Sequence, residues 1–337
     1  MEFRTHLAKW RGSLGLLAAS ALCLTATIAQ AAGFRLIEVP ADADGPALSG
    51  AMWYPCPEPP GEIDLGVITL SGAKDCPISG DKLPLVVVSH GNLGAFFDHH
   101  DTAETLADAG FVVAAISHRG DNSPNFPDGA DPSVMFERPL DIKRLIDFVI
   151  GASPAASNID PKRIGFFGFS AGGYTGLVLI GADPDWAAVL CRFSSVPLVC
   201  TRNLRKALRA RPLAPEPRIK AAVIADPPGP GIWFTPDSFA SVKVPVQLWA
   251  SETGGRDLPH ILAGLPESVA ALNRNLLEKH EYHVVPNAGH FAFLLCGPSI
   301  KAVPEFCKDA PGFDRVAFHT QFNADVLGFF RAQLGGR

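Results

Sequence analysis

The chain has 337 residues, of which 47% are hydrophobic and 19% are charged, and its formal net charge is −5. This mild charge is spread along the sequence, which excludes a strongly basic protein of the kind that binds nucleic acid or an anionic membrane. We therefore expect a small-molecule ligand and no nucleic-acid partner. The length fits one large domain after removal of a short leader.

Residues 1–31 have the pattern of a secretory signal peptide. Basic residues at positions 4, 9 and 11 precede an apolar run over 14–29, which ends in Ala29-Gln30-Ala31. The run is too short for a comfortable membrane span, and no later stretch reaches the length of about 20 residues that spanning needs. We expect a mature domain over 32–337 that is exported to the periplasm or secreted, with no membrane span.

Seven cysteines are present, and Cys23 would leave with the leader. An even number of six then remains in a chain bound for an oxidising compartment, which favours disulfides. There is no CxxC pair to support a metal site. The six fall into three pairs that are close in sequence, although sequence alone leaves the connectivity open: Cys56 with Cys76, Cys191 with Cys200, and Cys296 with Cys307.

The elements before residue 83 are predicted to be antiparallel edge strands separated by Pro-rich turns, at 34–39, 47–54 and 65–70. From residue 83 onward, short apolar runs alternate with helical periodicity, which is typical of a mostly parallel sheet with helices on both faces. The predicted strands of this part are 85–89, 111–116, 164–169, 219–225, 246–250 and 282–285. The predicted helices are 98–109, 137–150, 171–181, 266–279 and 314–334.

Residues 183–217 interrupt this alternation. They contain Trp186, the pair Cys191 and Cys200, and a basic series. The basic series is Arg202, Arg205, Lys206, Arg209 and Arg211. In this topology the segment lies above the carboxyl edge of the sheet, where ligands bind. We interpret it as a small cap insertion; the alternative is a solvated helical insertion with no role in a site.

The sharpest motif is Gly168-Phe169-Ser170-Ala171-Gly172, which follows an apolar strand and opens a helix. A serine hydroxyl is a poor nucleophile unless it is exposed beside a base and its oxyanion is stabilised. The G-x-S-x-G turn meets these needs because only glycine fits beside the serine and the helix start supplies backbone N–H groups. We expect Ser170 to be a nucleophile; the alternative is a Gly-rich packing turn.

An oxyanion hole needs two backbone N–H donors, one after the nucleophile and one from the loop after an earlier strand. Ala171 would give the first donor. The loop Ser89-His90-Gly91-Asn92-Leu93-Gly94 follows the predicted strand 85–89, so Asn92 would give the second, with Leu93 as the alternative. For His90, beside this loop, a structural hydrogen bond is favoured over a catalytic role.

The base should follow the last strand, and His290 does so in Asn287-Ala288-Gly289-His290-Phe291. The acid has three candidates. Asp226 ends the strand 219–225 and is favoured, while Asp257 and Glu252 follow the next strand and remain alternatives. Whichever carboxylate it is, it would orient the imidazole and stabilise the imidazolium.

Three stretches of the sequence resemble one group of enzymes. They are Ser89-His90-Gly91 with the Gly-Ala-Phe run after it, residues 112–115 leading into His118-Arg119, and the elbow 168–173. Together they resemble bacterial predicted dienelactone hydrolases and the related plasma-type platelet-activating-factor acetylhydrolases, from about Phe34 to the end. The resemblance implies the α/β-hydrolase fold. In the acetylhydrolases the acid follows the strand after the nucleophile helix, which implies Asp226 here.

These observations favour hydrolysis of a carboxylic ester through an acyl-serine, with Ser170, His290 and Asp226 as the triad and no metal or organic cofactor. Two alternatives remain open. One is a peptidase or amidase on the same triad, although the chain has no large gating domain. The other is a hydrolase fold that binds a ligand without catalysis, since fold alone does not decide function.

Overall fold

The computed structural model describes residues 31–122, 134–185, 215–228, 234–254, 266–277, 280–296 and 304–335. Three sequence-based expectations lie largely or wholly outside these ranges. They are the leader, the cap with its Cys191 and Cys200 pair, and the alternative acid Asp257.

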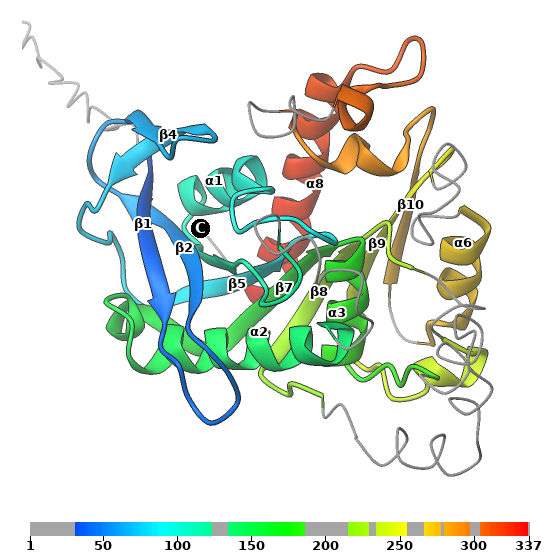
Figure 1. Ribbon diagram of the computed structural model, residues 1–337, viewed down its shortest axis with the longest axis horizontal. Coiled ribbons are helices and arrows are strands. Elements are labelled where there is room, and N and C mark those ends of the chain that lie inside the picture. Colours follow the sequence, from blue (N-terminus) through cyan, green and yellow to red (C-terminus); the bar gives the residue numbers. More distant parts are fainter. Residues whose placement is uncertain are drawn as a thin grey trace, which may run out of the picture.

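A ten-stranded sheet runs through the described residues, in the order β10-β9-β8-β7-β5-β6-β2-β1-β4-β3 (Figure 1). Six neighbouring strands, β10 to β6 in this order, are parallel. They are β5 (Leu83–Ser89), β6 (Val112–Ile116), β7 (Ile159–Phe169), β8 (Ile219–Ala225), β9 (Val246–Ser251) and β10 (His280–Val285). All six predicted strands of the parallel part are therefore present, and no strand end differs from its predicted position by more than five residues.

Four strands extend the sheet at its other side: β1 (Ala31–Val39), β2 (Leu48–Cys56), β3 (Gly61–Asp64) and β4 (Thr69–Lys74). β2 is antiparallel to both β1 and β6. The predicted strand 65–70 is misplaced, because residues 65–68 form the turn between β3 and β4 and only residues 69 and 70 belong to β4. Asp64 Oδ1 accepts the Gly66 N–H at 2.7 Å, and Gly66 has a φ of 80°, which favours glycine and ends the extended run.

Helices cover both faces of the sheet (Figure 1). On one face lie α1 (His100–Asp108) and α8 (Arg315–Leu334), whose buried residues share a core with the strands. On the other face lie α2 (Val134–Gly151), α3 (Ala171–Leu179) and α6 (Pro266–Asn275). Short 3-10 helices are η3 (Ala156–Asn158), η5 (Pro236–Phe239), η6 (His290–Phe293) and η7 (Pro304–Cys307).

The two helical layers explain the composition of the central strands. In β5, the side chains from Pro84 to Ser89 are all buried, and they alternate between the two cores. A parallel strand covered on both faces therefore reads as a continuous apolar run. The carboxyl ends of β5, β7, β8, β9 and β10 meet at one edge, so the loops that follow these strands are brought together.

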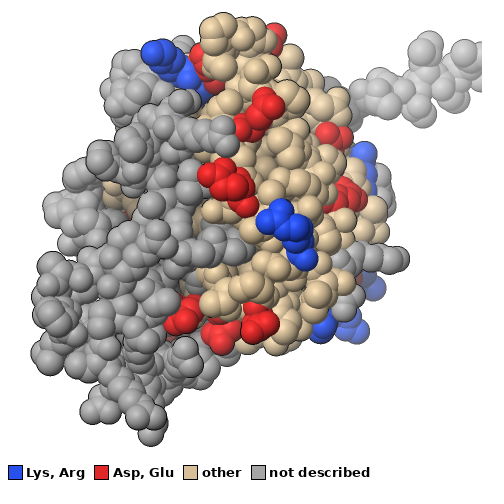
Figure 2. All heavy atoms as spheres, turned by 90° about the vertical axis from the view of Figure 1, so that its right-hand side faces the viewer, with Lys and Arg blue, Asp and Glu red and all other residues tan. Residues whose placement is uncertain are grey.

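Disulfides join Cys56 to Cys76 and Cys296 to Cys307, which are two of the three expected pairs. No helix among the described residues is both long and apolar enough to cross a bilayer. On the face shown in Figure 2, the described carboxylates and the described Lys and Arg side chains are scattered among uncharged residues.

Candidate active site

Ser170 lies in the turn between β7 and α3, where its φ is 54°. A positive φ is uncommon for a residue with a side chain and marks a strained position that the surroundings must enforce. The N–H of Ser170 donates to Ala225 O at 2.9 Å. A Cβ at Gly168 would lie 2.3 Å from Gly172 O, and a Cβ at Gly172 would lie 1.9 Å from Ser89 O. Glycine is therefore required at both positions, and the turn holds the serine at the carboxyl edge.

His290 connects Ser170 with Asp226, from loops that follow three different strands. Its Nε2 is 3.0 Å from Ser170 Oγ, and its Nδ1 is 2.7 Å from Asp226 Oδ2. Ser170 is 6% exposed, His290 4% and Asp226 0%. The ring of Phe169 packs against the imidazole with a centroid distance of 4.8 Å. The structure thus brings the expected nucleophile, base and favoured acid into one hydrogen-bonded chain.

Asp226 is held rigidly after β8. Its backbone N–H donates to Trp249 O at 2.9 Å. Its carboxylate accepts two further hydrogen bonds from Ser251, one from the backbone N–H to Oδ1 at 2.8 Å and one from the hydroxyl to Oδ2 at 2.7 Å. These bonds leave Oδ2 directed at His290 Nδ1. Ser251 had no signal in the sequence, because its partnership depends on β9 lying beside β8.

Glu252, one of the alternative acids, has a different partner. Its Oε2 accepts the Asn287 N–H at 2.7 Å, and so it fastens the loop that precedes His290. Asp257 lies outside the described residues. Of the candidates that the structure describes, Asp226 is the carboxylate in contact with the imidazole.

The two expected oxyanion donors are backbone N–H groups on either side of Ser170. Ala171 is the first residue of α3, so its N–H has no acceptor within the helix. Within the described residues, the N–H groups of Asn92 and Ala171 have no protein acceptor. The alternative donor Leu93 is disfavoured, because its N–H donates to Asp121 Oδ1 at 2.7 Å. Asn92 is therefore the better candidate of the two loop residues.

His90 bonds with the backbone on both sides of its ring. Its Nδ1 lies 2.6 Å from Gly91 O, and its Nε2 accepts the His118 N–H at 3.0 Å. Burial, and then the charge of Arg138, hold the pKa of His90 and that of His118 well below the ordinary value of 6.5. Both rings are neutral near pH 7. This arrangement agrees with the structural hydrogen bond expected for His90.

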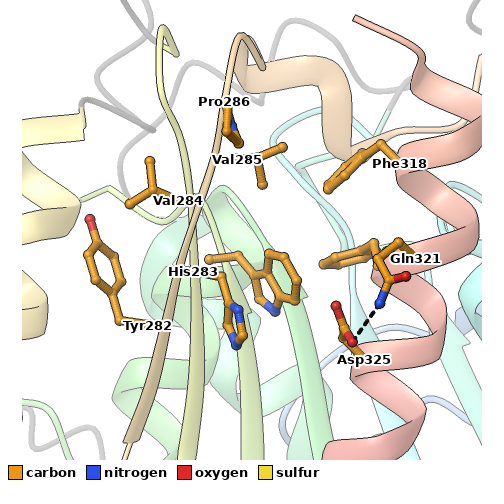
Figure 3. Close-up of a pocket in the computed structure, with 10 residues that line it drawn as sticks. Tyr282, His283, Val284, Val285, Pro286, Phe318, Gln321 and Asp325 are labelled. Carbon is orange, nitrogen blue, oxygen red and sulfur yellow. Dashed lines mark hydrogen bonds between the residues drawn. The ribbon is translucent and has the colours of Figure 1, made fainter.

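A hollow of about 380 Å³ lies beside the sheet edge, between β10 and α8 (Figure 3). Its walls include Tyr282 and His283 from β10 and Phe318 and Asp325 from α8. The ring of His283 stacks on Trp249 with a centroid distance of 4.2 Å. None of the three residues of the hydrogen-bonded chain lines this hollow, so it is separate from the candidate active site.

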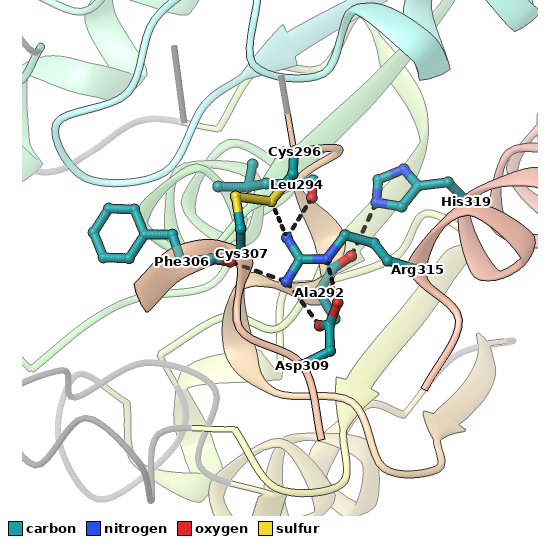
Figure 4. Close-up of a disulfide and its surroundings, with 8 residues drawn as sticks. All are labelled: Ala292, Leu294, Cys296, Phe306, Cys307, Asp309, Arg315 and His319. Carbon is teal, nitrogen blue, oxygen red and sulfur yellow. Dashed lines mark hydrogen bonds and ion pairs between the residues drawn. A yellow bond between two sulfur atoms is a disulfide. The ribbon is translucent and has the colours of Figure 1, made fainter. Parts of the chain in front are cut away.

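The segment after His290 is fastened to α8 by Arg315 (Figure 4). Arg315 donates to Leu294 O at 2.9 Å and to Cys296 Sγ at 3.0 Å, and it forms a two-nitrogen ion pair with Asp309. Cys296 is also joined to Cys307 by a disulfide. The helix η6, which begins with His290, is therefore braced on its C-terminal side. The sequence predicts the cysteine pair, but it carries no signal for the role of Arg315.

Known proteins share part of this sequence and most of this fold. The sequence model of the BD-FAE family matches residues 77–183, which is less than half of the chain. A ferulic acid esterase from Streptomyces cinnamoneus superposes with a TM-score of 0.62 and 17% identity, over 92% of this chain and 91% of that one. The chain has the α/β-hydrolase fold.

A second solved structure is also similar in fold. An esterase from Pyrococcus furiosus superposes with a TM-score of 0.50 and 17% identity, over 90% of this chain and 93% of that one. No curated protein matches the sequence significantly. Neither the family model nor the two structures named here carry a dienelactone hydrolase or acetylhydrolase description, and what they support for this chain is the α/β-hydrolase fold. In the described ranges, no group of three or more His, Cys, Asp or Glu side chains could hold a metal ion.

Proposed function

We propose that this protein is a serine hydrolase that cleaves carboxylic esters. The observation that carries the proposal is the chain from Ser170 Oγ through His290 to Asp226, with distances of 3.0 and 2.7 Å, at the carboxyl edge of an α/β-hydrolase sheet. A nucleophile, its base and an orienting acid in contact are the requirements for acyl transfer at serine.

In the proposed reaction, Ser170 Oγ attacks the ester carbonyl carbon and its proton moves to His290 Nε2. Asp226 keeps the ring in the tautomer that presents a free Nε2, and it stabilises the imidazolium. The N–H groups of Asn92 and Ala171 donate hydrogen bonds to the carbonyl oxygen as it becomes negatively charged. Collapse expels the alcohol, which takes the proton from His290. Water then attacks the acyl-serine by the same route and releases the carboxylic acid.

We favour an ester over an amide as the substrate because of the proteins to which this fold is similar. The two structures named above are a ferulic acid esterase and an esterase, each 17% identical to this chain, and they support an ester substrate. A closer relation to the dienelactone hydrolases or the acetylhydrolases is part of the proposal and rests on the sequence motifs. The location we propose is outside the cytoplasm, which the two disulfides support.

The test is turnover of a panel of p-nitrophenyl esters and p-nitroanilides by the wild type and by Ser170→Ala. We expect ester hydrolysis that the substitution reduces to below a few per cent, with the circular dichroism spectrum unchanged. Faster cleavage of anilides than of esters would favour the amidase alternative. A wild type that cleaves neither class would favour a non-catalytic binding protein.

A further inference from the structure

Arg138 of α2 is fully buried and contacts residues near the candidate oxyanion hole, but it is not in the hydrogen-bonded chain of Ser170, His290 and Asp226. Its Nη1 pairs with Asp121 Oδ2 at 2.5 Å, and Asp121 is also fully buried. Its Nη2 donates to His90 O and, at 3.2 Å, to Ser89 Oγ. Its Nε donates to Thr175 Oγ1 at 3.1 Å. One guanidinium thus holds the end of β5, the loop after β6 and helix α3.

The partners of Arg138 lead to both oxyanion donors. On the loop side, Asp121 Oδ1 accepts the N–H of Leu93, the residue after the donor Asn92. On the helix side, the Thr175 hydroxyl donates at 2.9 Å to the carbonyl of Ala171, the residue that carries the other donor. The two N–H groups come from segments about 80 residues apart in sequence, and the Arg138 network spans both.

We propose that Arg138, with Asp121 and Thr175, positions the oxyanion hole by fixing the N–H of Asn92 relative to the N–H of Ala171. The inference rests on the proposed function, because it concerns the charge that develops in that reaction. An oxyanion hole acts through donors held in place before the reaction, so a small displacement of one donor weakens it. Arginine suits the task because its planar fork donates in several directions at once.

The competing explanation is that the network only stabilises the core. Breaking a buried ion pair leaves an uncompensated charge and is strongly destabilising, so substitutions of Arg138 do not separate the two explanations well. Thr175 does separate them, because it is neutral and valine matches its shape. Thr175→Val removes the acceptor for Arg138 Nε and the donor to Ala171 O, whereas Thr175→Ser keeps the hydroxyl.

Ser153 offers a matched control. It is also buried, its hydroxyl donates to the carbonyl four residues earlier, Val149 O, at 2.7 Å, and it accepts the Ala155 N–H. It lies before β7, at the opposite edge of the sheet from Ser170. Ser153→Ala therefore removes the same type of buried bond without touching the oxyanion hole.

The experiment measures kcat and KM for a p-nitrophenyl ester, and Ki for a trifluoromethyl ketone, whose adduct with Ser170 places an oxyanion in the hole. Enzyme concentrations come from titration of active sites with a fluorophosphonate. We expect Thr175→Val to lower kcat about tenfold and to raise Ki by a similar factor, with KM within about twofold. Thr175→Ser should stay within about threefold of the wild type, and Ser153→Ala should change neither kcat nor Ki.

Asp121→Asn provides a second variant, for which we expect a loss of kcat at least as large as that of Thr175→Val. A Thr175→Val enzyme that loses stability but keeps the kcat and Ki of the wild type, as Ser153→Ala does, would overturn the inference. A wild type without esterase activity would instead overturn the proposed function, and the inference with it. The two failures are distinguishable, because only the second removes the activity of the wild type.

Discussion

The orientation of the His290 ring depends on the carboxylate of Asp226, which two hydrogen bonds from Ser251 hold in place. Asp226 Oδ2 accepts from His290 and from the Ser251 hydroxyl, while Oδ1 accepts from the Ser251 N–H. An amide in place of the carboxylate would favour the wrong imidazole tautomer and would not stabilise the imidazolium. We predict that Asp226→Asn lowers kcat by about 10³ to 10⁴ with the fold intact.

Glu252→Gln is the matched control for this substitution. It makes the same change of carboxylate to amide in the loop after the neighbouring strand, where Glu252 contacts the Asn287 N–H instead of the imidazole. Steady-state kinetics should show a loss of less than about tenfold for Glu252→Gln. Equal losses in the two variants would contradict the assignment of Asp226 as the acid.

His99 is expected to make the unfolding free energy depend on pH, independently of the reaction. Its ring packs against Phe167 and Phe169, and its Nε2 has no hydrogen-bond partner in the described part of the chain. Burial lowers the pKa of His99 to about 3. In the unfolded chain, with a pKa of about 6.5, the same ring takes up a proton as pH falls. The contribution of the neutral His99 ring to the unfolding free energy is therefore fully present above pH 6.5, and it is lost as the pH falls below that value.

We predict that His99→Phe removes this part of the acid sensitivity. Between pH 7.5 and pH 5.0, the unfolding free energy of the wild type should fall by about 2 kcal/mol more than that of the variant. Urea unfolding at the two pH values measures both changes, and any packing cost of the substitution cancels in the difference. Equal pH dependence of the two proteins would show that His99 is protonated in the folded state.

Ser170 and His290 could be predicted as partners because each lies in a local motif beside a strand end, and the structure places them in contact. The sequence left the acid open, since three carboxylates follow strands in the right part of the chain and the choice depends on which strand neighbours which. It missed Arg138 because an arginine in an amphipathic helix normally faces solvent. Only the packed structure shows that this one is buried against Asp121.

Among the elements, long apolar runs were predicted well and short polar strands were not. β5 and β7 are bounded by clear turns and covered on both faces, so their patterns are unambiguous. The hairpin of β3 and β4 has only one buried face and a turn whose centre is apolar, which concealed the turn in the sequence. Helix α2 begins at Val134, three residues before the expected start.

The two described disulfides have sequence separations of 20 and 11. Because the stabilisation depends only on the logarithm of the loop length, we predict that removal of either costs about 3 kcal/mol of stability. Their effects on activity should differ. Cys296 and Cys307 brace the segment after His290, whereas Cys56 and Cys76 join β2 to the residues after β4, away from the site.

The comparison uses two double variants, Cys296→Ala with Cys307→Ala and Cys56→Ala with Cys76→Ala. Urea unfolding should give comparable losses of stability, and kcat per folded molecule should fall severalfold in the first variant only. An unchanged kcat in both would show that Arg315 and α8 hold His290 without the help of the disulfide.

For the molecule as a whole, local patterns predicted a mostly parallel sheet with helices on both faces, and the fold confirms this. The order of the strands could not be predicted in this way, because pairing such as β5 between β7 and β6 is decided by packing between distant segments. The cap over 183–217 lies mostly outside the described residues, and its role in selecting substrates stays a prediction.

The proposed export predicts two properties of the mature protein, its N-terminus and its thiol content. We expect the mature protein to begin near Ala32 and to contain no free thiol, because six cysteines remain after cleavage and four of them are paired in the described residues. Intact-mass measurement of protein from an oxidising compartment, with and without a thiol reagent under denaturing conditions, checks both points. Two free thiols would mean that Cys191 and Cys200 are unpaired.

The central claim is that Ser170 is a nucleophile activated by His290. The most direct test is reaction with a fluorophosphonate, followed by proteolysis and mass spectrometry of the labelled peptide. The account predicts one adduct per chain, located on Ser170, which is absent in Ser170→Ala and forms at least about 10² times more slowly in His290→Asn. Labelling at another residue, or equal rates in the wild type and His290→Asn, would contradict it.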